Sequence, residues 1–245
     1  RVHAWQLENS EDMVVAQLGR DLGSRLLCSM LPEPKRLTTF TYGLSEQQSD
    51  SSEVRVGLAV AKRNGNAGRQ VHLSHFHRFI QRSWGLDGIS SHLSGMHLFE
   101  FFGAMKQQLP HSNRLLSGFL GESWAGGLSF EPLTQADDVA QLFDSEGMSV
   151  SREFSKLRDD GCLLEQFWNE KRERLEDPRF RIIEAVRLKM MALSSTLRLP
   201  QTLGFEPWAP FLDPMLAMAM LNFSEADREN RRWLLEYFSY KRLLV

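Results

Sequence analysis

Short strand-like segments alternate with helical patterns through the first half of the chain, and this alternation limits the possible folds more than any other feature. Residues 13–18, 37–42, 70–73 and 114–120 each form an apolar or β-branched run bounded by turn residues. The stretches between them carry apolar residues at helical spacing. Parallel strands need a long crossover, usually a helix, whereas antiparallel strands need only a short turn. The alternation therefore predicts an α/β fold, with a parallel sheet and helices on both of its faces.

The helices between the strands carry start and stop signals. Ser51 or Ser52 can act as the N-cap of one helix, and Gly65 suits the residue that ends it. Further helices are expected over residues 24–31, 75–84 and 91–109.

The second half of the chain, from residue 131 onward, has a different pattern, because helical spacing dominates and β-branched runs are few. Asp177-Pro178 separates two charged helices, and residues 199–210 read as an irregular, proline-containing segment. Asp213 is the expected N-cap of a final apolar helix over residues 214–221, with proline at its first position. We expect one domain over residues 1–245, with an α/β layer over 1–130 and a mainly helical part over 131–245.

Composition excludes several classes of function. The formal net charge is −2, so bulk attraction to nucleic acid or to an acidic membrane surface is not expected. No segment approaches the roughly 18 apolar residues that span a bilayer, and no signal-peptide pattern opens the chain. The two cysteines, Cys28 and Cys162, are far apart and fit neither a disulfide framework nor a zinc site. These features predict a cytoplasmic protein.

Glycine-rich turns follow the first and fourth predicted strands, at residues 19–23 and 121–127. In an open parallel sheet, ligands bind in the crevice beyond the carboxyl ends of the strands. A turn that leads into a helix also offers free backbone N–H groups and a positive dipole end, which suit a phosphate. The alternative interpretation is that these glycines only make tight turns.

Six segments, taken in order, resemble the synthetase domain of glutamine-dependent asparagine synthetases. Gly118 to Gly127 (GFLGESWAGG) resembles the family's G-D-x-x-x-G-G, and Gly204 to Asp213 (GFEPWAPFLD) resembles G-x-E-x-x-x-P-F-L-D. Residues 18–27 stand where the family carries its pyrophosphate loop, S-G-G-x-D-S. The remaining segments are residues 39–43, 52–61 and 231–235, the last of which is the basic stretch before a helix.

The resemblance implies an ATP-dependent, AMP-forming amide ligase or amidotransferase. Such an enzyme adenylates a carboxylate substrate with ATP and Mg²⁺, and ammonia or an amine then displaces AMP; a glutaminase domain or subunit is the implied ammonia source. Glu122 and Asp21 are the implied magnesium ligands, and Arg232 or Lys241 would neutralise charge on the pyrophosphate. The residues implied for ATP binding are Gly19, Asp21, Ser24, Arg25, Thr41, Tyr42, Gly43, Gly118 and Gly121.

The first loop departs from the family pattern, and this departure leaves a second interpretation open. When this loop is aligned on Ser24, the family's first serine becomes Gly19 and its two glycines become Arg20 and Asp21. The family's aspartate becomes Gly23. Glu122 also stands where the family has aspartate; it keeps the charge but moves the oxygens outward, whereas Mg²⁺ prefers near-ideal octahedral geometry. The alternative function is therefore a catalytically degenerate domain that serves as a binding or assembly module.

Overall fold

The computed structural model describes residue 5 and residues 13–87, 95–144 and 162–244. Five parallel strands form one sheet in the order β3-β2-β1-β4-β5. Their bounds are Val14–Gln17 (β1), Leu37–Thr41 (β2), Ala67–Gln70 (β3), Arg114–Leu116 (β4) and Glu206–Trp208 (β5). The predicted parallel α/β fold is confirmed at this level.

The strand order creates a switch point beside the central strand. The chain steps outward from β1 to β2 and β3, then crosses back to place β4 on the other side of β1. Val15 of β1 is thus paired with Thr38 on one side and with Leu115 on the other. The loops after β1 and β4 leave the same edge of the sheet, which is where open α/β sheets form ligand crevices.

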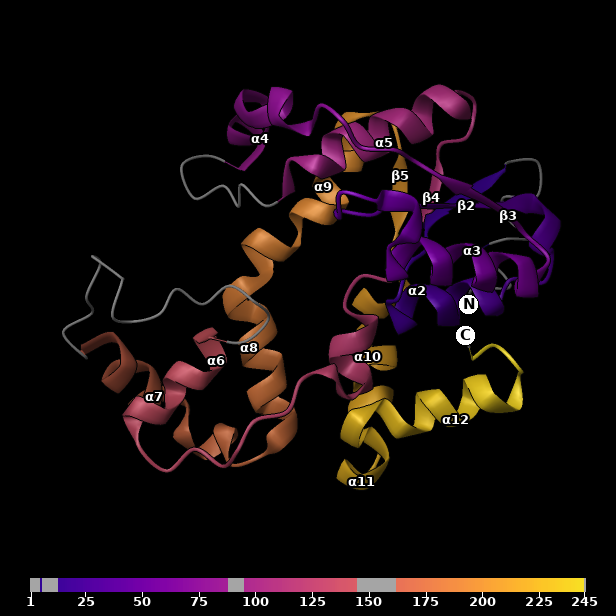
Figure 1. Cartoon of the computed structure of the whole chain (residues 1–245). Coiled ribbons are helices and arrows are strands. Elements are labelled where there is room, and N and C mark those ends of the chain that lie inside the picture. Colours follow the sequence, from indigo (N-terminus) through magenta and orange to yellow (C-terminus); the bar gives the residue numbers. More distant parts are fainter. Residues whose placement is uncertain (1–4, 6–12, 88–94, 145–161, 245) are drawn as a thin grey trace.

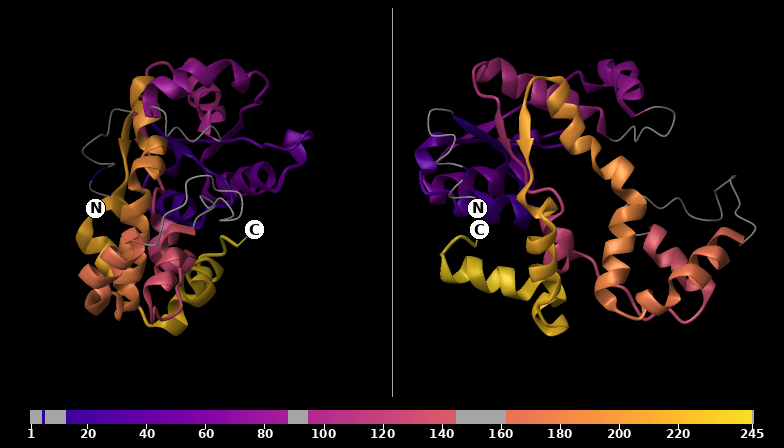
Figure 2. Two further views of the ribbon diagram at one scale, coloured as in Figure 1. Left: turned by 90° about the vertical axis from the view of Figure 1, so that its left-hand side faces the viewer. Right: turned by 180° about the vertical axis from the view of Figure 1, so that it is seen from behind.

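Helices cover both faces of the sheet, as Figures 1 and 2 show. Val14 and Ala16 contribute to one core with the helices α2 (Leu22–Ser29) and α3 (Ser52–Asn64). Val15 points to the opposite face and joins a second core with α5 (His97–Gln108) and α9 (Ser195–Thr202). Successive side chains of a strand point to opposite faces of the sheet, and both faces are covered here. Both therefore need apolar side chains, which explains the continuous apolar run of β1.

Several predicted boundaries shift. The third strand is Ala67–Gln70 rather than 70–73, the fourth ends at Leu116 rather than at 120, and α2 begins at Leu22 rather than at Ser24. The segment predicted to be irregular, 199–210, instead contains the end of α9 and the edge strand β5. In the predicted helical region 75–84 a 3₁₀ turn, Phe76–Phe79, leads into α4 (Ile80–Asp87). The helix predicted over 91–109 begins at His97, and residues 91–94 lie outside the described residues.

The cap signals read from the sequence are confirmed. Ser51 caps α3 by accepting a hydrogen bond from Val54 N, and Gly65 ends this helix with φ +78°. Asp213 caps α10 (Pro214–Leu221), where Met215 N donates to its Oδ1 at 2.9 Å.

The second half of the chain is mainly helical, as expected. α6 (Ala140–Asp144), α7 (Cys162–Leu175) and most of α8 (Pro178–Leu193) lie away from the sheet, at the lower left of Figure 1. Two further helices, α11 (Glu225–Arg228) and α12 (Arg232–Tyr240), return the chain to the face that α2 covers. No helix in the described part of the chain combines the length and apolarity needed to cross a membrane.

Candidate functional site

The first turn of α2 is closed by the carboxylate of Asp21. This residue has extended backbone dihedrals and is the N-cap. Its oxygens accept hydrogen bonds from Gly23 N (3.2 Å) and Ser24 N (2.7 Å), and the hydroxyl of Ser24 donates to it as well. The N-terminal N–H groups of a helix have no partner within the helix. Asp21 therefore satisfies two of the groups that would otherwise bind an anion.

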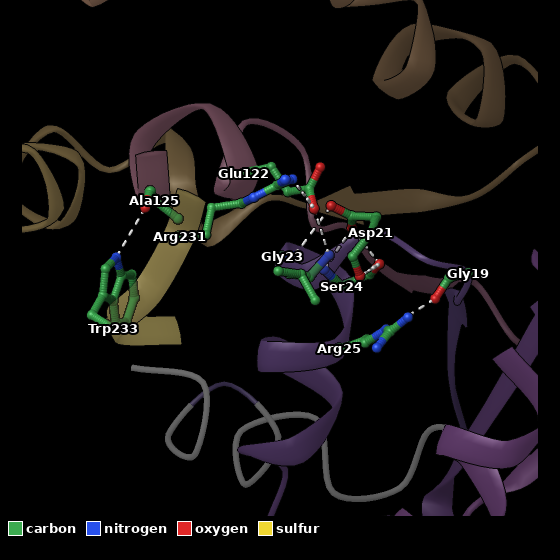
Figure 3. Close-up of polar contacts among 10 residues, drawn as sticks. Gly19, Asp21, Gly23, Ser24, Arg25, Glu122, Ala125, Arg231 and Trp233 are labelled. Carbon is green, nitrogen blue, oxygen red and sulfur yellow. Dashed lines mark hydrogen bonds and ion pairs between the residues drawn. The ribbon is translucent and has the colours of Figure 1, made fainter. Parts of the chain in front are cut away.

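Glu122 satisfies a third backbone N–H group at the same place. It follows β4 and its Oε1 accepts a hydrogen bond from Leu22 N at 3.0 Å, across 100 positions of sequence. The same oxygen lies 3.4 Å from Nη1 of Arg231 (Figure 3). The turns after β1 and β4 are thus side by side, as the glycine pattern predicted.

The two turns are packed too closely for side chains at several of their glycines, and Gly23 and Gly118 lie at the contact between them. A Cβ at Gly23 would lie 2.9 Å from the carbonyl oxygen of Gly118 and 3.1 Å from Cα of Gly121. A Cβ at Gly118 would collide with Ser24 N. The departure at Gly23, where the family has aspartate, is therefore matched by packing that leaves no room for a side chain.

Two tryptophans connect the second glycine turn to the C-terminal segments. The turn contains one wide helical turn, Ser123–Gly127. Trp124 Nε1 donates to the carbonyl of Phe211 at 2.9 Å, and Trp233 Nε1 donates to the carbonyl of Ala125 at 3.0 Å (Figure 3). Four of the segments that carry the resemblance, 18–27, 118–127, 204–213 and 231–235, consequently meet around the start of α2.

A cavity of about 660 Å³ lies above this junction, at the carboxyl ends of β1, β2 and β4. Of the residues predicted for the site, those that line it are Gly19, Asp21, Ser24, Thr41, Tyr42, Gly118 and Glu122. Residues that were not predicted to belong to the site also line it, among them Gln17, Glu53, Phe102, Ser117, Ser123 and Thr196. These come from five separate segments, and only the fold brings them together.

Five predicted site residues lie outside the lining of this cavity. Arg25 is buried on α2, where its Nε donates to the carbonyl of Gly19 at 3.2 Å, and desolvation lowers the pKa of its guanidinium. Gly121 packs against the ring of Phe211, and Gly43 lines a second cavity. The other two are Arg232 and Lys241.

The two basic residues predicted for the site near α12, Arg232 and Lys241, both contact groups outside the cavity. Arg232 pairs with Asp227 and Glu236, each at 3.3 Å, and Lys241 lies over the ring of Tyr240. Arg231 instead points to Glu122. The backbone turns at this point, because both Asn230 and Arg231 have positive φ, at 52° and 60°.

Burial and neighbouring charges shift the protonation of two groups that line the cavity, Asp21 and Tyr42. Burial, and to a smaller extent the charge of Glu122, raises the pKa of Asp21 above its ordinary value of 3.8, against the opposing hydrogen bonds from Ser24 and Gly23. At the rim of the cavity, Arg20 lies 4.0 Å from Glu53. Tyr42 hydrogen-bonds to His97 at 2.9 Å, and burial raises the pKa of Tyr42 to about 12.

The predicted magnesium ligands do not form a metal site by themselves. Within the described residues, no three His, Cys, Asp or Glu side chains converge on a point where they would hold a metal ion. Asp21 is engaged by three donors of α2, and Oε1 of Glu122 by Leu22 and Arg231. Both carboxylates thus have hydrogen-bonding roles in the fold, and a magnesium ion held by them would have to take its other ligands from waters and from a bound phosphate.

Comparison of the chain with protein-family models gave no match, and a search of curated proteins gave none either. The case for a function therefore depends on the residues and contacts described above.

Proposed function

We propose that this chain is a noncatalytic, small-molecule-binding module with an asparagine-synthetase-like architecture. The cavity at the carboxyl edge of the sheet is its binding site. The proposal rests on one observation above the rest, which is that the anion-binding end of α2 is filled by the protein's own carboxylates.

The start of α2 is where a nucleotide pyrophosphate would have to bind. Such a group needs free N–H groups and a positive dipole end. Here Leu22, Gly23 and Ser24 donate to Glu122 and Asp21. A pyrophosphate would have to displace both carboxylates and would then lie beside their negative charges, which is unfavourable at short range.

The packing of the loop after β1 is a second feature that disfavours adenylation. The resemblance places a metal-binding aspartate where this chain has Gly23, and no side chain fits there beside Gly118. The basic residues that the resemblance implied, Arg232 and Lys241, face other partners. The glycine at this position and the contacts of Arg232 and Lys241 with other groups therefore favour a role without adenylation.

The cavity at the carboxyl edge of the sheet is present although the start of α2 is occupied by carboxylates. This supports a binding role rather than a purely structural one. Its volume of about 660 Å³ falls within the range of small-molecule sites, roughly 300–1,000 Å³. Its lining combines apolar side chains such as Phe102 and Leu115 with the hydroxyl groups of Ser45, Ser117 and Thr196.

A second candidate is the active ATP-dependent amide ligase. The contact between Arg231 and Glu122 favours it, because it brings a cation and a carboxylate to the start of α2. In that case Glu122 would leave Leu22 when Mg²⁺-ATP binds, Arg231 would face the pyrophosphate, and a glutaminase domain or subunit would supply ammonia.

Thermal denaturation with Mg²⁺-ATP separates the two candidates. A ligand at 100 times its Kd stabilises the folded state by about 2.7 kcal/mol. We expect no such shift for the wild type at millimolar Mg²⁺-ATP. Asp21→Ser keeps an N-cap hydroxyl but removes the charge, and this variant should gain measurable stabilisation by inorganic pyrophosphate. A wild-type shift that disappears in Arg231→Gln, together with AMP release from a carboxylate and ammonium, would establish the ligase instead.

A further inference from the structure

A second cavity, of about 310 Å³, adjoins the first at the end of β2. It is lined by Gly43, Leu44, Gln48, Leu73, Phe76, Met96 and His97. None of these residues is an Asp, Glu, Lys or Arg. A charged group placed here would be desolvated without an opposite charge, which is costly, whereas an apolar group would gain from burial.

Two polar side chains, Gln48 and His97, line this cavity, and Gln48 is already used within its wall. Gln48 Nε2 donates to the carbonyl of Leu73 at 2.6 Å, and Leu73 N donates to Gln48 Oε1 at 2.8 Å. This pair of hydrogen bonds fixes the loop after β2 to the segment after β3. Gln48 therefore shapes the cavity and leaves Leu44, Leu73 and Phe76 as its apolar surface.

The two cavities share a partition. Leu44 lines both of them, and Tyr42 in the first cavity is hydrogen-bonded to His97 in the second. Leu44 is 65% exposed and Phe76 is 38% exposed. Single exposed apolar side chains are common on proteins. Here, however, two of them border one cavity beside a larger one of mixed polar and apolar lining, so a ligand that spans the partition would cover both.

We infer that the second cavity binds the apolar end of a small amphipathic molecule, with an aliphatic chain or a single ring, whose polar end occupies the first cavity. The inference rests on the proposed function, because it takes the first cavity as a binding site. The volume limits the apolar end to a short group, since about 310 Å³ is at the low end of ligand cavities. Arg20 and Glu53 at the rim of the first cavity provide one cation and one anion for the polar end.

Two homologous series of probes test the inference, n-alkylamines and n-alkanoates from four to eight carbons, with Kd measured by calorimetry. Each added methylene should strengthen binding about fourfold until the second cavity is full. Leu44→Ser and Phe76→Ser should flatten this dependence on chain length. Phe143→Ser, which changes an apolar side chain of similar exposure on α6, is the matched control and should leave it unchanged. All three positions are exposed enough for the variants to fold.

In each series, the change in log Kd per methylene (the slope) reports on the second cavity. The affinity common to the whole series (the intercept) reports on the first cavity. Arg20→Gln should weaken all alkanoates by a common factor, and Glu53→Gln should do the same for all amines, with the slope per methylene intact. A slope that is absent from the wild type, or that survives in both Leu44→Ser and Phe76→Ser, overturns the inference. A normal slope with an intercept that neither rim variant changes would instead refute the first cavity as a binding site, and with it the proposed function.

Discussion

Asp21 and Glu122 hold positions that a bound anion would otherwise take, and each makes hydrogen bonds that the local fold needs. Asp21 caps its own helix, whereas Glu122 caps the same helix from a distant loop. Replacing such a residue tests folding and binding at once, because one substitution removes a charge and alters a cap. Variants that keep the shape and remove only the charge therefore separate the two effects.

Asp21→Asn should change how stability depends on pH. The pKa of Asp21 is raised in the folded protein, chiefly by burial, so the folded state binds the proton more tightly than the unfolded chain does. The wild type therefore gains stability as pH falls through the folded-state pKa towards 3.8, and loses this contribution as pH rises. Asparagine caps helices about as well as aspartate but does not titrate. Urea unfolding between pH 4 and pH 7 should show the wild type improving against Asp21→Asn on acidification. Parallel pH profiles for the two proteins would contradict a raised pKa of the partly buried Asp21.

Glu122→Gln should have little effect on stability, whereas Glu122→Ala should have a larger one. Glutamine keeps an oxygen for Leu22 N and loses only a partly exposed ion pair with Arg231, which is worth about 0–1 kcal/mol. Alanine leaves the N–H of Leu22 without its partner, and loss of a helix cap costs about 1 kcal/mol. The free energies of unfolding in urea give the comparison. Equal losses in the two variants would show that the charge, and not the hydrogen bond to Leu22, is what matters.

At the scale of elements, the start of α2 and the turn after β4 fit together because both lack side chains at their contact. Gly23 and Gly118 approach each other backbone to backbone, and Gly121 lies against both Gly23 and Phe211. This contact fixes the shape of the cavity floor.

Gly23→Ala should therefore destabilise the protein although alanine is the better helix former. Its Cβ would lie 2.9 Å from the carbonyl oxygen of Gly118 and 3.1 Å from Cα of Gly121, and both of these atoms belong to packed backbone. Overpacking of this kind costs about 1–3 kcal/mol. Gly19→Ala is the matched control, because a Cβ there meets nothing within 4 Å. Thermal or urea unfolding of the pair gives the answer, and a Gly23→Ala variant as stable as Gly19→Ala would show that the two turns are not packed as described.

The elements also show why the sequence predicted some parts of the sheet and not others. β1 and β2 are buried on both faces, so their apolar and threonine-rich runs are strong signals. β3 is an edge strand, mostly exposed, and the apolar residues that predicted a strand, Val71 and Leu73, are buried just beyond its end. β5 has only three residues, one of them Pro207, which an edge position tolerates. A short edge strand stabilised by its neighbour leaves almost no pattern in its own sequence.

The same limit applies to the site. The loops after β1 and β4 were predictable, because parallel strands bring their carboxyl ends to one edge. The choice between Arg231 and Arg232 was not, because it depends on two residues with positive φ in an unusual turn. The second cavity also arises only in three dimensions, since Leu44, Leu73 and Met96 come from different loops.

At the scale of the whole molecule, the two cores against the sheet are large, while a third cluster is small and remote. Among the residues that the structure describes, the third cluster has four buried members, Val139, Leu142, Leu175 and Ala185, contributed by the region of α6, α7 and α8. It lies away from the sheet, at the lower left of Figure 1. A unit that buries few apolar side chains opens at a lower free energy than the global unfolding of the protein.

Native-state hydrogen exchange should consequently show two levels of protection. The amides of α7 should exchange through a partial opening, at a lower free energy than those of β1 and β2.

Leu175→Ala removes a side chain that is 1% exposed in the third cluster, at a cost of about 2–5 kcal/mol. Because the cluster opens by itself, this loss should lower protection in α7 and the first turns of α8 and leave β1 unchanged. Leu116→Ala, in the large core on the α2 face, should lower protection in the sheet and in α7 alike, because it weakens the global fold. If Leu175→Ala instead lowered protection in β1 as much as Leu116→Ala does, the helical part and the sheet would unfold as one cooperative unit. The cavity would then respond to changes in α7, since the loops that form it are held by the same sheet.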